Sequence, residues 1–220
     1  DVYKRQKEHI TVSQKLYYNP NPNLSVLVYG SSFFMNTYDL IQDMTFSQAR
    51  DWTAGTKVTY HVKDWFSVTG SLHADFYDRF KRHERIDKRQ KDYESSIYQP
   101  RLTVTSNYFN GHSLILGMEH TSDELTSDRF SGNANHDLKT RALKETEYFL
   151  QDEWTINPRW MISVGIRTNF SKAFGFMGMP KVAAKYSPDK HWSLRANYSM
   201  GYRSPSICLL YTSPSPRDRT

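Results

Sequence analysis

The sequence has no run of apolar side chains approaching the roughly 18 residues that a membrane-spanning helix requires, which excludes a helical membrane protein. Its 10 glycines and 9 prolines are too few for a collagen-like or low-complexity chain. No Walker, dinucleotide-binding or Gly-x-Ser-x-Gly motif occurs, and the eight histidines include no pair at metal-ligand spacing. Yet 15 Tyr, 12 Phe and 5 Trp accompany a mean hydropathy of −0.72, a combination typical of sheets with one apolar and one polar face.

The only cysteine, Cys208, belongs to an end segment that is foreign to the rest of the chain. Residues 1–6 and 208–212 can be encoded by one DNA element read in opposite orientations, and that element resembles a transposon-based sequencing adapter. We therefore expect residues 1–6 and 208–220 to be translated adapter, and residues 7–207 to be an internal piece of a longer protein. That piece has no disulfide or cysteine metal site. Each end carries a net charge of +1, so the formal +6 falls to +4, too little to indicate nucleic acid binding.

Most of the chain alternates between apolar even positions and polar odd positions. In residues 66–80, Phe66, Val68 and Leu72 alternate with Ser67, Thr69 and others of that kind. This period of two predicts strands with one apolar face, because successive side chains of a strand point to opposite sides. The sequence predicts ten strands, at about 8–18, 24–38, 52–63, 66–80, 96–109, 112–121, 146–156, 160–169, 180–186 and 191–202.

The predicted connections alternate between short turns and long loops. The turns are rich in Asn, Pro, Gly and Asp, and include the hairpin signal Asn110-Gly111. The long loops are predicted at about 39–51, 81–95, 122–145 and 170–179. A meander of this kind has every turn on one rim and every long loop on the other, as outer-membrane barrels do. The charged run at 81–92 has mixed signs, which favours a solvated outer loop that contacts lipopolysaccharide phosphates over a nucleic-acid patch.

Aromatic residues occupy even positions at both ends of the predicted strands. Tyr and Trp favour the interface between membrane and water, so two such rows are expected to border a lipid-facing band. Ten residues separate Tyr98 from Tyr108, which at ~3.3 Å each and a tilt of ~40° rise about 25 Å, the height of such a band. The rows are Tyr18, Phe66, Tyr108, Trp154, Trp160, Tyr186 and Trp192 near the turns, and Tyr38, Trp52, Phe76, Tyr98, Tyr148 and Tyr202 near the loops.

The last third of this pattern resembles a known family. Tyr148-Phe149-Leu150-Gln151-Asp152-Glu153-Trp154 leads to the Gly165-Ile166-Arg167 tripeptide, then to Pro180-Lys181-Val182-Ala183 with Tyr186-Ser187-Pro188, and finally to Gly201-Tyr202-Arg203-Ser204-Pro205-Ser206. In this order the motifs resemble the barrel of TonB-dependent outer-membrane receptors.

The resemblance implies an all-β, antiparallel up-and-down transmembrane barrel, with this chain supplying about ten of 22 strands. It also implies a Gram-negative outer membrane and import of a scarce nutrient such as a siderophore, haem or cobalamin. A plug segment, not contained in residues 7–207, would contact the TonB energy-coupling complex. Outer-membrane lipid and a small nutrient ligand are the other expected partners, with no cofactor, no catalytic residue and no nucleic acid.

Two sets of residues are candidates for function. His83, His120 and His136 lie in or beside predicted long loops and are expected to touch an imported ligand. The charged residues on odd positions are expected to line the lumen, where they dock the plug, line the substrate path or simply solvate the interior. These are His73, Asp75, Arg79, Glu119, Glu153, Arg167, Lys181, Lys185 and Arg195.

Three other classes of protein remain open from the sequence. A pore or adhesin barrel without a plug would show the same strands. An outer-membrane barrel enzyme would need converging Ser, His or Asp side chains at the outer rim, and the sequence offers no such set. A soluble β-sandwich also alternates, but its strands are typically about 5–6 residues, shorter than most of these.

Overall fold

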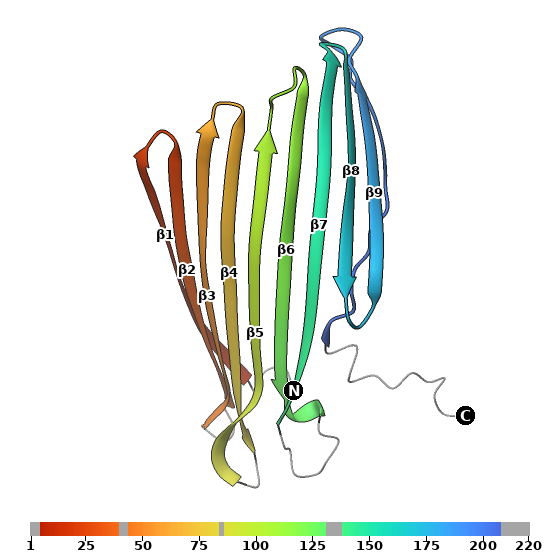
Figure 1. Ribbon diagram of the computed structural model, residues 1–220. Helices are drawn as coiled ribbons and strands as arrows, with labels where there is room; N and C mark the ends of the chain where they lie inside the picture. Colours follow the sequence, from red (N-terminus) through yellow and green to blue (C-terminus); the bar gives the residue numbers. More distant parts are fainter. Residues whose placement is uncertain (1–4, 40–43, 84–85, 131–137, 208–220) are drawn as a thin grey trace, which may run out of the picture.

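Ten antiparallel strands form one sheet in which each strand pairs with the next along the chain (Figure 1). The computed structural model describes residues 5–39, 44–83, 86–130 and 138–207. This confirms the prediction of an all-β meander of ten strands. They are β1 (Arg5–Asn21), β2 (Leu24–Asp39), β3 (Met44–Lys63), β4 (Phe66–His83), β5 (Ile86–Ser106), β6 (His112–Ser127), β7 (Lys139–Asn157), β8 (Trp160–Ser171), β9 (Gly175–Tyr186) and β10 (Leu194–Ser199), with a 3₁₀ turn, η2 (Asp128–Phe130), after β6.

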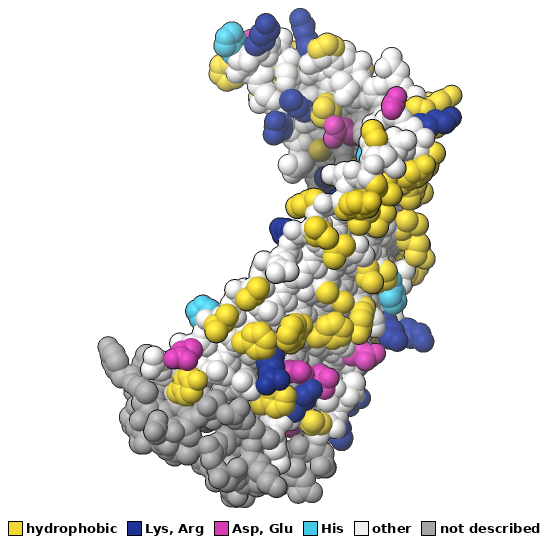
Figure 2. Space-filling view, turned by 90° about the vertical axis from the view of Figure 1, so that its left-hand side faces the viewer, with side chains coloured by type: hydrophobic (Ala, Val, Ile, Leu, Met, Phe, Trp, Pro, Cys, Tyr) yellow, Lys and Arg dark blue, Asp and Glu magenta, His cyan; other side chains and the backbone are white. Residues whose placement is uncertain are grey.

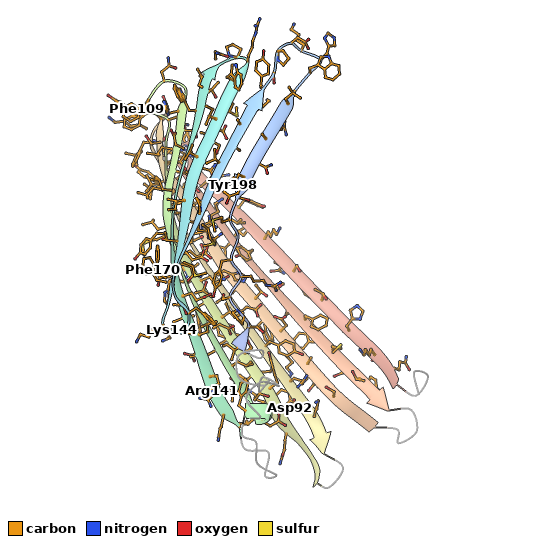
Figure 3. All side chains as sticks on the ribbon, turned by 90° about the vertical axis from the view of Figure 1, so that its right-hand side faces the viewer. Asp92, Phe109, Arg141, Lys144, Phe170 and Tyr198 are labelled. Carbon is orange, nitrogen blue, oxygen red and sulfur yellow. The ribbon has the colours of Figure 1, made fainter. Side chains whose placement is uncertain are left out.

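The sheet curves, so that it has a convex and a concave face (Figure 3). Over most of its area, residues of equal parity face each other across neighbouring strands, as in Leu72 opposite Pro100 and Thr53 opposite Asp75. Even positions therefore share one face and odd positions the other. Phe170 lies on the convex side and Asp92 on the concave side in Figure 3.

The convex face is apolar over its middle. Nearly all of the large hydrophobic side chains that remain exposed are even-numbered, and they gather in a broad band with charged side chains mostly beyond it (Figure 2). An apolar surface of this extent is not stable in water and marks contact with lipid or protein. The exposed hydrophobic side chains of this band include Leu72, Leu102, Leu116, Leu150, Val164 and Val182.

Two rows of aromatic rings border this band. On the rim of the short turns the rings of Trp160 and Tyr186 are 4.4 Å apart, and those of Trp65 and Tyr108 are 4.9 Å apart. At the opposite border of the band, on the same face, edge-to-face pairs join Phe34 to Trp52, Phe76 to Tyr98 and Tyr148 to Phe170. The rows are built from cross-strand pairs, which stabilise the sheet where its surroundings change from apolar to aqueous.

One ionisable pair interrupts the convex face. His112 and Asp152 are even-numbered, and His112 Nδ1 lies 2.8 Å from Asp152 Oδ2. The ring of Trp154 stacks on His112 at 5.2 Å between centroids. The carboxylate thus has a hydrogen-bond partner beside the aromatic row of the short turns, which lowers the cost of placing it on an apolar face.

The predicted long loops are largely wrong, because strands occupy most of them. Residues 81–83 and 86–92 of the charged run belong to β4 and β5, and β6 and β7 extend to Ser127 and Lys139. Polar residues on both faces resemble a loop in sequence, yet a hairpin beyond the membrane needs only backbone hydrogen bonds and no apolar face. The asymmetry between the rims is therefore one of strand overhang beyond the aromatic rows, not of loop length.

The last predicted strand, 191–202, is shorter than expected at both ends. Asp189 Oδ1 accepts hydrogen bonds from the backbone N–H groups of His191 and Trp192, at 2.7 and 3.0 Å, and this turn delays β10 until Leu194. The chain leaves the sheet after Ser199, and the N–H of Met200 makes one further bond to the Pro180 carbonyl.

The two edges of the sheet, β1 and β10, are not paired with each other within the described residues. No helix among the described residues is long and apolar enough to cross a membrane.

Spin labels provide a direct test of the two faces. A nitroxide at Leu72 of the intact protein is expected to contact hydrocarbon, and one at His73 to contact water, because these neighbours lie on opposite faces of β4. Collision with oxygen and with a water-soluble nickel complex distinguishes the two environments. Water at both positions, or an exchange of the two results, would contradict the assignment of faces.

Candidate functional site

The concave face carries the polar half of every strand, and side-chain hydrogen bonds cross it from strand to strand. The Tyr29 hydroxyl lies 3.0 Å from His73 Nδ1, and Thr53 Oγ1 donates to Asp75 Oδ2 at 2.9 Å. His73 and Asp75 are thus on the predicted face, and both are fixed by neighbouring strands. Asp51 is the next residue along from Thr53 on this face, and it lies partly buried near Asp75. Its Oδ1 is buried with no hydrogen-bond partner among the described residues.

Glycines create room for two aromatic rings on this face. The ring of Tyr29 lies over Gly55, where an added Cβ would be 2.2 Å from Tyr29 Cζ. The ring of Phe149 lies over Gly117 in the same way, at 2.3 Å. In both cases the aromatic residue is directly opposite the glycine on the next strand, so the ring can lie flat on the backbone.

Each of these rings supports an ionisable group. His73 stacks on Tyr29, and the Arg101 guanidinium lies 4.9 Å from the centre of the Phe149 ring. Arg101 also reaches Glu119, with 3.4 Å between Nη1 and Oε2. The lumen side therefore has ionisable groups on fixed aromatic supports, a geometry that orients charge toward the interior.

Glu147 is the centre of another polar group on this face. Arg167 donates to Glu147 Oε2 through Nε and Nη2, and Asn169 Nδ2 donates to Oε1 at 3.4 Å. Beyond β8 the face is cationic, because Lys181, Lys185 and Arg195 make no ion pair with any side chain that the structure describes. Lys185 and Arg195 are directly opposite each other on β9 and β10. Like charges in register repel, so this strip favours an anionic partner.

At the outer rim a β-bulge turns Asp92 toward the concave face. The register steps from Arg79 opposite Tyr93 to Phe80 opposite Lys91, which leaves Asp92 as the extra residue. Its carboxylate accepts two hydrogen bonds from Arg79, at 3.1 and 2.8 Å, and lies 3.2 Å from Lys81 Nζ. Burial lowers the pKa of the Arg79 guanidinium, but the hydrogen bonds to Asp92, together with the charges of Asp92, Tyr77 and Tyr93, outweigh burial and hold that pKa above its ordinary value.

The segment that follows β10 crosses the concave face toward β6 and β7. Ser204 Oγ donates to Glu145 Oε2 at 2.9 Å, and Ile207 is buried against Leu125 and Leu143. A groove between this segment and the sheet is lined by Asp123, Glu145 and their neighbours. Ser204 of the Arg203-Ser204-Pro205-Ser206 motif thus contacts β7, which is three positions away from β10 in the sheet.

The three predicted ligand histidines are not brought together within the described residues. His120 lies in β6, within the predicted strand 112–121, and faces the convex side, where its Nδ1 is 2.9 Å from Thr146 Oγ1. The side chain of His83 and the whole of His136 lie outside the described residues. Glu119, Glu153, Arg167 and Arg195 occupy odd positions in the strands, on the concave face.

Several concave-face residues were missed from the sequence. Arg101 and Glu147 are odd-numbered residues in predicted strands, so the alternation alone would have identified them. Asp51 was assigned to a loop. Asp92 has the wrong parity, and nothing in the sequence marks the bulge that reverses it. Among the described residues, no three His, Cys, Asp or Glu side chains are grouped so that they could hold a metal ion.

A curved meander of long strands, apolar outside between two aromatic rows and ionised inside, defines part of a wide β-barrel of the outer-membrane class. The family model "TonB dependent receptor-like, beta-barrel" matches residues 4–218, and the chain belongs to this family of outer-membrane transporters of Gram-negative bacteria, which are not enzymes. The match also runs through residues 208–218, and the adapter origin of the two ends stays a prediction.

Three proteins of similar sequence or structure have names that refer to iron. An iron-regulated outer membrane virulence protein of Vibrio cholerae serotype O1 is 24% identical over 153 residues, which are 67% of this chain and 21% of that protein. The ferric enterobactin receptor PfeA of Pseudomonas aeruginosa superposes with a TM-score of 0.78 at 12% identity, covering 91% of this chain and 34% of the receptor. The ferric citrate transporter FecA gives 0.68 at 11% identity, covering 89% and 36%. The chain thus spans about a third of the length of these two solved proteins and about a fifth of the Vibrio protein.

Proposed function

We propose that this barrel segment belongs to a receptor that imports a ferric chelate of the siderophore type across the outer membrane, driven by TonB through a plug. The observation that carries the proposal is that the concave face of this family member is ionised along its length, so that it can line a path for a polar, charged solute. The similar proteins named for iron, enterobactin and citrate support the same class of substrate.

The test uses the full-length receptor gene in a Gram-negative strain that lacks its own ferric siderophore receptors. Radioactive iron bound to enterobactin or to citrate should enter cells that express the receptor, and uptake should vanish when tonB is deleted in the same strain. Uptake that persists without TonB would favour a pore without a plug. Absence of uptake for every ferric chelate, with folded receptor in the membrane, would remove the proposed substrate class.

Within this function, Lys181, Lys185 and Arg195 are assigned to plug docking rather than to substrate contact. Lys185 and Arg195 lie near the short-turn rim of the concave face, beside Tyr186 and Leu194, and Lys181 lies opposite Gly165, midway along β8. In the family this rim faces the periplasm, where the plug fills the lumen. Carboxylates of the plug would neutralise the strip, because opposed like charges there are otherwise destabilising.

Reversal of this strip, by Lys181→Glu, Lys185→Glu and Arg195→Glu together, should reduce ferric-chelate uptake by about tenfold or more, since repulsion across an interface costs several kcal/mol. The same variant should admit a large antibiotic that the closed receptor excludes, measured as a lower inhibitory concentration. The matched control is Lys181→Arg, Lys185→Arg and Arg195→Lys, which keeps the charge and should keep both properties. Unchanged uptake and exclusion in the reversed variant would remove plug docking as the role.

A further inference from the structure

The convex face has a step between two hairpins, just beyond the outer aromatic row. β7 pairs with β8 only as far as Glu145 opposite Ser171, whereas it continues to pair with β6 as far as Lys139 opposite Ser127. Residues 139–144 of β7 therefore extend past the β8–β9 turn with no strand on that side among the described residues. A groove lies at this step, and its lining comes from β6, β7 and the β8–β9 turn.

The part of the groove nearer the middle of the sheet is aromatic. Phe170 and Phe176 are in contact, with 4.9 Å between ring centres, and Tyr148 meets Phe170 edge to face. Phe170 and Phe176 both line the groove and are exposed. These three rings form the outer aromatic row at this point of the sheet, so acyl chains are expected to reach the groove from the lipid-facing band.

The part of the groove nearer the outer rim is basic. Lys144 lies two residues beyond Thr146, which is opposite Phe170, and Lys172 lies two residues beyond Phe170 on the turn. Both lysines are exposed, and they stand about 6–7 Å along the strands from the aromatic row. His120, which contacts Thr146 at the level of Phe170, also lines the groove. Figure 3 shows Lys144 and Phe170 on the same convex side of the sheet.

No carboxylate of the described residues lines the groove. Glu145 lies on the concave face with Ser204, and the outward Glu124, opposite Ala142, is not part of the lining. The groove thus combines two cations with no described counter-ion and an apolar floor that continues into the lipid band.

We infer that this groove, with Lys144 and Lys172 nearer the outer rim than Phe170 and Phe176, binds the phosphorylated headgroup of a lipid A molecule of the surrounding leaflet. The height of the lysines matches a phosphate at the boundary of headgroup and acyl chains, and the aromatic floor matches the first part of the acyl chains. Ammonium groups near a membrane surface bind anionic lipid additively. The step between the hairpins also forms a groove that can hold a headgroup, which a flat sheet surface cannot do.

The charged hairpin at 81–92 is a weaker candidate for the same role. Lys91 lies 2.8 Å from Asp78 Oδ1 and 3.2 Å from Glu94 Oε2, and Lys81 is paired with Asp92. Hydrogen bonds to Asp78 and Glu94 raise the pKa of Lys91 against its partial burial, so its charge is retained but already balanced. A phosphate would have to displace these carboxylates, whereas Lys144 and Lys172 need no such exchange.

The experiment uses the purified full-length receptor in detergent, with bisphosphorylated hexa-acyl lipid A, the same lipid without phosphates, and inorganic phosphate as probes. Native mass spectrometry should show preferential retention of bisphosphorylated lipid A. The variant Lys144→Gln with Lys172→Gln should bind it about thirtyfold more weakly, at roughly fivefold for each lysine. Inorganic phosphate alone should neither bind stably nor displace the lipid, since the aromatic floor holds the acyl chains.

The matched control is Lys15→Gln with Lys57→Gln, which removes two exposed cations from the concave face and should leave lipid A binding unchanged. Heat-modifiable migration on gels confirms that each variant is a folded barrel before binding is compared. Equal binding by the wild type and the groove variant, equal loss in the control, or no preference for the phosphorylated lipid would each overturn the inference.

Discussion

Replacing Leu102 with arginine is expected to destabilise the folded receptor by about 2–4 kcal/mol, the cost of a cation at the middle of the lipid-facing band of a barrel. Leu102 lies in β5 between the aromatic residues Tyr98 and Tyr108, and 44% of its surface is exposed on the convex face. In the membrane that exposed surface contacts acyl chains, which cannot hydrate a guanidinium. The measurement is the free energy of unfolding of the full-length receptor in lipid vesicles, from denaturant titration.

Thr103→Arg is the matched control, because the adjacent residue places the same side chain on the concave face. Thr103 is opposite Thr69 and Gly117 on the concave face. Its arginine is expected to change the stability by less than about 0.5 kcal/mol, as substitutions away from buried features usually do. Similar losses in the two variants would mean that lipid does not contact the even-numbered face.

The alternation of residues was sufficient to predict the number of strands, their order and their two faces. It works because lipid and lumen impose opposite requirements on successive side chains, so each central residue such as Leu72 or His73 carries the signal independently. The aromatic rows were equally predictable, since Trp160 and Tyr186 mark the boundary by their chemistry alone. The turn at Gly111 was predicted from Asn-Gly, and its φ of 77° is the left-handed conformation that this dipeptide favours.

The sequence was least informative beyond the outer aromatic row. There both faces are wet, so the period-two pattern fades although the strands continue to Ser127 and His83. Parity also fails there, because the bulge at Asp92 reverses the faces for the rest of that strand. The lipid groove was invisible for a related reason. It depends on where β8 stops beside β7, and strand ends of polar hairpins leave no mark in composition.

Asp92→Ala should destabilise the receptor by about 2–3 kcal/mol, the larger of the effects expected at the outer rim. Asp92 is 3% exposed and holds Arg79 through two hydrogen bonds and Lys81 through a third contact. Its removal leaves two cations side by side without a counter-ion. Both remain partly accessible to water, with side chains 24% and 34% exposed, so the loss should fall short of that for a fully buried pair.

The matched control for this substitution is Glu94→Ala, two residues along the same strand. Glu94 meets Lys91 at 3.2 Å with half of its side chain exposed, and such a surface pair is worth about 0.2–1 kcal/mol. Denaturant titration of both variants, with hydrogen exchange of the β4–β5 hairpin, separates a local from a global effect. A large loss with exchange increased mainly in that hairpin is expected, because the bulge is held by these contacts and not by the apolar band. Equal, small losses in the two variants would show that the Asp92 cluster does not secure the rim.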